Sequence, residues 1–91
     1  MITFSRMSWY NVSQPYIIIF SNSHDKFFIA TFQDLESFLK GFDKDKDVFL
    51  IIDRASSKVL KQGKESFRLL IAYITNKDRF LNPPEQFVIG N

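Results

Sequence analysis

Three extended segments of this chain are apolar on both of their faces, and this limits the folds available to it. They are residues 16–20 (YIIIF), 27–30 (FFIA) and 48–52 (VFLII). Successive side chains of a strand point to opposite sides of the sheet, so a sheet with one face in water alternates apolar and polar residues. These segments do not alternate. Both faces of the sheet that they form must therefore be covered.

The first half of the chain predicts a hairpin followed by a helix. Residues 16–20 and 26–32 form the expected hairpin around the polar turn SNSHDK. Residues 31–42 then place apolar side chains on one side of a helix. Thr31 is its predicted N-cap, and Gly41 is predicted to end it in a left-handed conformation.

The second half repeats strands and a helix in a similar order. Strands are expected at residues 48–52 and 58–62. A helix follows Gly63, with Phe67, Leu70, Ile71 and Ile74 at helical spacing, and it ends between Asn76 and Phe80, before Pro83 and Pro84. A last strand is expected at 86–89.

Two arrangements fit this order of elements. The first is a two-layer antiparallel sheet of four to five strands with two helices on one face, in the order ββαββα. The second takes residues 26–89 in the ferredoxin-like order, strand, helix, strand, strand, helix, strand, and adds residues 16–20 at an edge. Both are two-layer α+β folds.

The second face of this sheet needs a cover that two helices on one face do not supply. Each large apolar side chain left in water forgoes roughly 1.5–3 kcal/mol, against a total stability of about 5–15 kcal/mol. Either an N-terminal arm of uncertain structure, residues 1–14, folds over this face, or the face is a protein interface, most simply that of a symmetric homodimer. Trp9, Tyr10 and Tyr16 are the candidate contact residues.

The length of the chain predicts a single domain over residues 1–91. Two cores within 91 residues would each be too small to fold alone. The chain has no cysteine, which excludes disulfides and thiolate metal sites. Because it has no apolar run of signal-peptide or membrane-spanning length, we expect a cytoplasmic protein with no membrane partner.

No residue pattern indicates catalysis. His24 is the only histidine and lies in a predicted turn, and there is no Gly-x-Ser-x-Gly motif. The acidic run at 43–47 begins like a calcium loop, but Arg54 stands where that loop needs a bidentate Glu. Gly63-Lys64 lacks the other residues of a phosphate-binding loop. We therefore expect no enzyme activity, no cofactor and no metal site.

One stretch, DRASSKVLKQGKESFR at residues 53–68, has a local excess of positive charge. Residues 1–53 hold five cations and seven anions, whereas residues 54–91 hold seven cations and three anions. The cations of this stretch are the candidate contacts for an anion, a nucleic acid or an acidic partner protein. They are Arg54, Lys58, Lys61, Lys64 and Arg68.

These features lead to two functional hypotheses. The first is a small non-catalytic interaction protein that acts by binding and occupying a partner protein, of the accessory or inhibitor type that phages and mobile elements often carry. The second is a sequence-independent nucleic-acid-binding protein that uses the basic stretch on phosphates.

Overall fold

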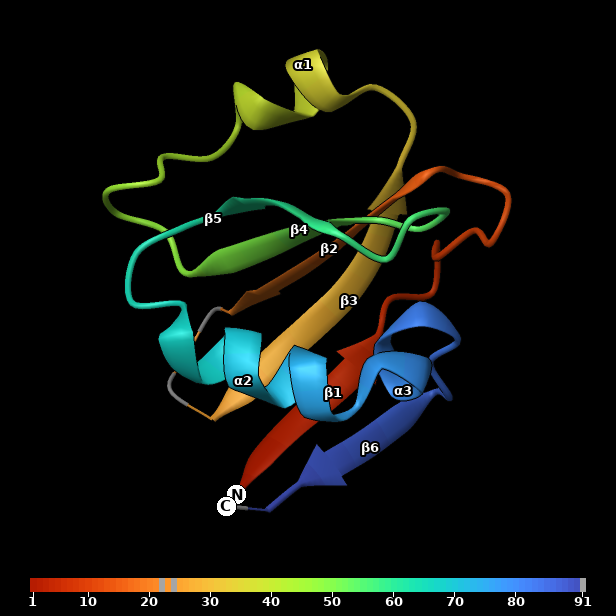
Figure 1. Cartoon of the computed structure of the whole chain (residues 1–91), viewed down its shortest axis with the longest axis vertical. Helices are drawn as coiled ribbons and strands as arrows, with labels where there is room; N and C mark the ends of the chain where they lie inside the picture. Colours follow the sequence, from red (N-terminus) through yellow and green to blue (C-terminus); the bar gives the residue numbers. More distant parts are fainter. Residues whose placement is uncertain (22, 24, 91) are drawn as a thin grey trace.

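The computed structural model describes residues 1–21, 23 and 25–90, and it is an α+β fold, as predicted (Figure 1). A single sheet of six strands carries three helices. The strands are β1 (Ile2–Arg6), β2 (Tyr16–Ser21), β3 (Lys26–Phe32), β4 (Phe49–Asp53), β5 (Val59–Gln62) and β6 (Gln86–Ile89). The helices are α1 (Leu35–Leu39), α2 (Phe67–Thr75) and α3 (Lys77–Leu81).

The sheet is mixed, with the strand order β5-β4-β2-β3-β1-β6. All neighbouring strands are antiparallel except β1 and β3, which are parallel. The predictions of a four- to five-stranded antiparallel sheet and of the ferredoxin-like alternative are therefore wrong in strand count and topology. The predicted hairpin of residues 16–20 and 26–32 is confirmed as β2 and β3.

The strand missing from the prediction is β1, within the expected arm at residues 1–14. It lies inside the sheet, where Phe4 is the register partner of both Phe27 in β3 and Phe87 in β6. Its short sequence alternates buried Ile2 and Phe4 with the less buried Thr3 and Ser5. Residues 2–6 are therefore part of the sheet and not a cover over it, while Met7 packs on one face of the sheet and Tyr10 on the other.

One face of the sheet, which we call the α2 face, packs against α2 and α3. After β5 at one edge, the chain crosses this face as the two helices and returns as β6 at the other edge. Leu69 and Tyr73 of α2 and Phe80 of α3 are buried against it. The Phe80 ring meets that of Phe4 edge-on, with the ring centroids 4.9 Å apart.

The opposite face, the α1 face, is covered by α1 and the segment that follows it. Phe38 stacks on Phe32 with ring centroids 4.0 Å apart and an interplanar angle of 8°. The covering side chains of this segment are Leu35, Phe38, Leu39 and Phe42, joined by Met7 from the segment after β1, and they pack on Ile18, Ala30, Phe32, Phe49 and Ile51. The apolar side of the first predicted helix thus does face the core.

α1 and α2 lie on opposite sides of the sheet (Figure 1), so the prediction that both helices cover one face is wrong. The reason is topological. Strand β2 separates β3 from β4, and their connection crosses the α1 face, while the connection from β5 to β6 crosses the α2 face. The strands that are apolar on both faces are therefore covered on each face by helices of the same chain.

The ends of α1 differ from the prediction. Thr31 belongs to β3, and Asp34 is the N-cap, whose carboxylate accepts the backbone N–H groups of Glu36 and Ser37. The C-cap is Lys40 in a right-handed conformation, and Gly41 does not have a positive φ. The helix begins later than predicted because the strand before it runs on to Phe32.

The second predicted helix is divided into α2 and α3 at Asn76. The Asn76 side-chain amide donates to the carbonyl of Ala72 at 3.0 Å, and the Thr75 hydroxyl donates to that of Ile71 at 2.9 Å. Such side-chain bonds compete with the backbone bonds of a helix. None of the helices in the described residues has the length and hydropathy needed to span a bilayer.

Phe38→Ala should lower the free energy of unfolding by about 2 kcal/mol, because it removes a half-buried ring that covers the α1 face. Urea denaturation followed by circular dichroism measures the change. Phe67→Ala is the matched control on another helix, since this side chain is 74% exposed, and it should change stability by less than about 0.5 kcal/mol. Equal losses for the two variants would contradict the role given to α1.

Candidate protein-interaction surface

Three large apolar side chains lie exposed along the outer side of α2. Phe67 is 74% exposed, Ile71 46% and Ile74 54%. Positions separated by four and then three residues fall on the same side of a helix. We call these residues the α2 stripe, and they form a continuous apolar surface on a regular element.

The rotation of α2 about its axis is fixed by contacts on its inner side. The hydroxyl of Tyr73 donates to the carbonyl of Ser57 at 2.6 Å, and that of Ser66 donates to the carbonyl of Gly63 at 3.0 Å. Of the apolar residues predicted from helical spacing, only Leu70 packs against the core. The buried side is formed by Leu69, Ala72 and Tyr73. The side of α2 predicted to face the core was wrong because α2 is apolar around most of its circumference, so its spacing pattern does not single out one side.

A groove of about 340 Å³ separates α2 from the C-terminal end of β6. Its α2 side is lined by residues that include Phe67, Ile71 and Ala72, and its other side by Ile2, Ile89 and Gly90. Arg68 is the charged residue that lines it. The groove joins the α2 stripe to the edge of the sheet as one mainly apolar surface.

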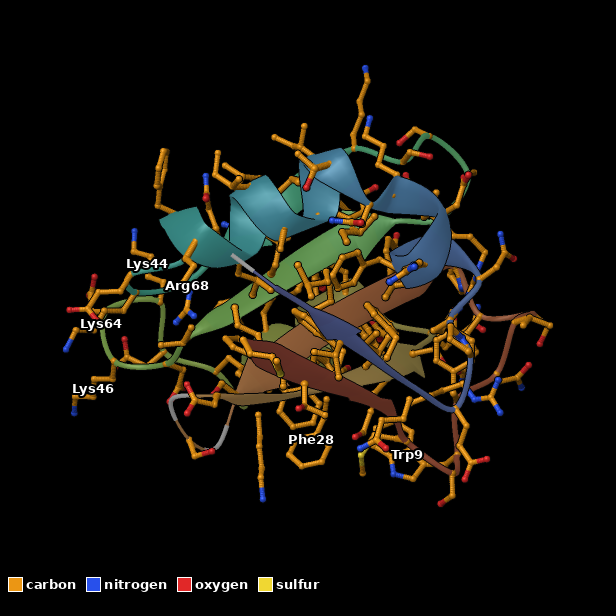
Figure 2. All side chains as sticks on the ribbon, turned by 90° about the horizontal axis from the view of Figure 1, so that it is seen from below. Trp9, Phe28, Lys44, Lys46, Lys64 and Arg68 are labelled. Carbon is orange, nitrogen blue, oxygen red and sulfur yellow. The ribbon has the colours of Figure 1, made fainter. Side chains whose placement is uncertain are left out.

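The three aromatic residues predicted as interface contacts do not lie on one surface. Trp9 is 53% exposed and points away from the side of the molecule that carries α2 and α3 (Figure 2). Tyr10 is half-buried and its hydroxyl accepts a hydrogen bond from Arg54 Nη2 at 2.7 Å. Tyr16 stacks on Phe32, with ring centroids 5.3 Å apart. Two of the three are thus engaged within the fold.

Arg54, one of the five predicted anion contacts, is bonded within the protein. Its Nη1 donates to the carbonyl of Leu81 at 2.8 Å and its Nε to that of Gln14 at 3.2 Å. The guanidinium carbon lies 5.3 Å from the ring centroid of Tyr10. This side chain therefore ties the turn after β4 to the segment before β2 and to the end of α3.

The other four predicted cations are spread from the residue before β5 to the first turn of α2. Lys58 and Lys61 are exposed, just before β5 and within it. Lys64, in the turn before α2, and Arg68, in the first turn of α2, gather with Lys44 and Lys46 at one end of the molecule (Figure 2). The five predicted contacts do not converge on one surface.

The basic cluster at that end contains an equal number of acids. Its cations come from the stretches DKDKD (43–47) and KESFR (64–68), which also hold Asp43, Asp45, Asp47 and Glu65. The hollow next to it is lined by Lys46 and Arg68 and also by Asp47 and Glu65. Opposite charges at these separations weaken the field that a phosphate backbone would meet.

The described residues contain no group of three or more His, Cys, Asp or Glu that could hold a metal ion. In the acidic run, the Asp43 carboxylate accepts the N–H of Asp45 at 2.8 Å, and the Asp47 carboxylate accepts the N–H of Asp43 at 2.8 Å. These carboxylates stabilise the turn itself. His24 lies outside the described residues.

No protein-family model, curated protein or solved structure matches the chain. A function must therefore be inferred from the structure itself, and the α2 stripe and its groove are the surface features that we use for this. The sequence periodicity of residues 67–75 predicted an apolar helix. It could not predict that the α2 stripe is exposed, because this depends on which side of α2 packs against the sheet.

Arg54→Ala should lower the free energy of unfolding by about 2 kcal/mol, because it leaves carbonyl groups and the Tyr10 hydroxyl without their donor. Lys58→Ala, a change at an exposed cation close by, should alter it by less than about 0.5 kcal/mol. Chemical denaturation of both variants measures the difference. If both substitutions are neutral, Arg54 does not act as a structural tie.

Tyr73 should make stability depend on pH in the alkaline range. Burial raises the pKa of its phenol above the ordinary 10.0, and a smaller contribution from the side chain of Ser57 lowers it. Because the unfolded chain ionises first, this contribution is complete below about pH 10 and is lost as the pH rises further. Denaturation between about pH 8 and 11 should show this loss in the wild type and in Tyr16→Phe, and a smaller loss in Tyr73→Phe.

Proposed function

We propose that this protein is a non-catalytic binding module that acts by docking on a partner protein through the α2 stripe. The observation that carries the proposal is the exposure of three large apolar side chains in a row on a helix whose other side is buried. Each such side chain gains roughly 1.5–3 kcal/mol when it leaves water. A partner that covers the stripe would recover this free energy.

α2 is anchored to the sheet along its inner side, which favours binding because little order has to be gained on association. Leu69 and Tyr73 are buried beneath the helix. Before the helix, Gly63 packs so closely that an added Cβ would lie 2.1 Å from the carbonyl oxygen of Asp47. The stripe is therefore presented in one orientation before any partner arrives.

The charges beside the stripe indicate the kind of partner surface that fits. Lys64 and Arg68 are exposed near Phe67, at the N-terminal end of α2. Arginine and aromatic residues, including Phe, are enriched in protein interfaces. A complementary partner would present an apolar centre with acidic residues at one end. Binding of this kind suits an accessory or inhibitor protein that occupies a site on its target.

Nucleic-acid binding fits the charge distribution less well. It requires several cations free to contact phosphates at once, whereas Arg54 is bonded to backbone carbonyls and the cluster near α2 is interleaved with acids. The basic stretch therefore supports protein binding better than phosphate binding.

The proposal is tested by quantitative capture from an extract of the source cell, with nuclease present. The baits are the wild type, Ile71→Glu and the control Lys58→Glu, each immobilised at the same density after circular dichroism shows it to be folded. A charge within the stripe must be desolvated on docking, so Ile71→Glu should reduce retention of the partner at least about tenfold. Lys58→Glu should retain it.

The same comparison must then hold with the captured protein in purified form, measured by calorimetric titration. Equal affinity for the wild type and Ile71→Glu would overturn the proposal. So would binding that disappears with nuclease, together with a steeply salt-dependent electrophoretic shift of single- or double-stranded DNA or RNA, since that outcome supports the nucleic-acid hypothesis instead.

A further inference from the structure

The two edge strands of the sheet differ in their protection against pairing with another chain. β5 carries Lys61, and its pairing with β4 is irregular between Ile51 and Ile52. Charged residues and bulges are the usual means of blocking an exposed edge. β6 has no charged residue, and its pairing with β1 is regular along its length. In Figure 1 no backbone lies beyond it.

The free backbone groups of β6 belong to Gln86 and Val88. Along β1, the N–H groups of Thr3 and Met7 donate to carbonyls of Asp25 and Ile29, on the β3 side. The N–H group of Arg6 donates to the carbonyl of Glu85, the residue before β6. Bonding alternates along a strand, so residues 85, 87 and 89 face β1 and residues 86 and 88 face outward.

We propose that two copies of this chain pair antiparallel through β6, about a two-fold axis at Phe87, so that their sheets become one. This register places Gln86 opposite Val88 of the partner subunit, and by symmetry Val88 opposite Gln86 of the partner subunit. Both residues have outward N–H and C=O groups, so each pair can exchange two hydrogen bonds. An isologous contact of this kind closes after two copies and leaves no further free β6 edge.

Two opposite charges near the ends of β6, Glu85 before the strand and Arg68 of α2 beside its end, are brought together in this register. Glu85 of the partner subunit lies opposite Ile89, on the face of the sheet that carries α2, because residues 85, 87 and 89 share a side. Arg68 lines the groove at Ile89. Neither the Arg68 guanidinium nor the Glu85 carboxylate has an ion-pair partner within the described residues. The symmetry forms this pair twice, and the partner subunit completes the groove.

The dimer would present both α2 stripes on the same side. A two-fold axis between antiparallel strands of one sheet is perpendicular to that sheet, so each face continues across the interface. The contact proposed here leaves the α2 stripe uncovered but engages Arg68, so Lys64 is the cation that stays available beside the stripe for a partner protein. It differs from the homodimer predicted through the second face of the sheet. That face is occupied in large part by α1.

Sedimentation equilibrium of the full chain tests the dimer. We expect a reversible dimer in the wild type at concentrations up to about 100 µM. Val88→Pro removes an outward N–H without removing a bond to β1, so it should abolish the dimer and leave the circular dichroism spectrum unchanged. Val88→Lys gives the same test without constraining the backbone. Leu60→Lys on the β5 edge is the control and should still dimerise.

Charge reversal tests the register. Arg68→Glu and Glu85→Arg should each weaken the dimer about tenfold, and the double variant should restore it. A monomeric wild type, or a dimer that survives both Val88 substitutions, overturns the proposal. A dimer that survives them but is lost in Ile71→Glu assigns the contact to α2. If the β6 dimer forms but Ile71→Glu retains its partner protein, the proposed function fails while this inference stands.

Discussion

The constraint on which the whole structure depends is that three central strands are apolar on both faces. Such strands are stable only when each face is covered, since a few exposed large side chains would cancel much of the stability of a chain of this size. The protein meets this requirement through its topology. The connection between β3 and β4 carries α1 across one face, and the connection between β5 and β6 carries α2 and α3 across the other.

This solution leaves an excess of apolar side chains on α2. The helix supplies Leu69, Ala72 and Tyr73 to the core, and the α2 stripe remains outside. A helix that only served as a cover would be polar on its outer side. The groove beside it and the unprotected β6 edge lie next to this excess, whereas the β5 edge carries the features that prevent association. The two proposals therefore concern the same region of the molecule.

Basic residues in one stretch of sequence have separate roles in the fold. Arg54 is held by backbone carbonyls and supports three segments of the structure. Arg68, fourteen residues later, lies at the groove. A run of charge in the sequence carries no information about which members face solvent together, because a turn, a strand and a helix direct them to different sides.

Hydrophobic patterning alone predicted the α+β class, the β2–β3 hairpin, β4, β5, β6 and both helical regions, because strand and helix periodicity are local properties. It also showed that both faces of the sheet had to be covered. Tertiary structure decided the rest. The place of β1 inside the sheet, the side on which α1 packs, the outward side of α2 and the edge position of β6 all depend on contacts between residues far apart in the chain. An apolar residue such as Ile71 has the same local pattern whether it meets the core or water, and only the packing of the helix on the sheet distinguishes the two.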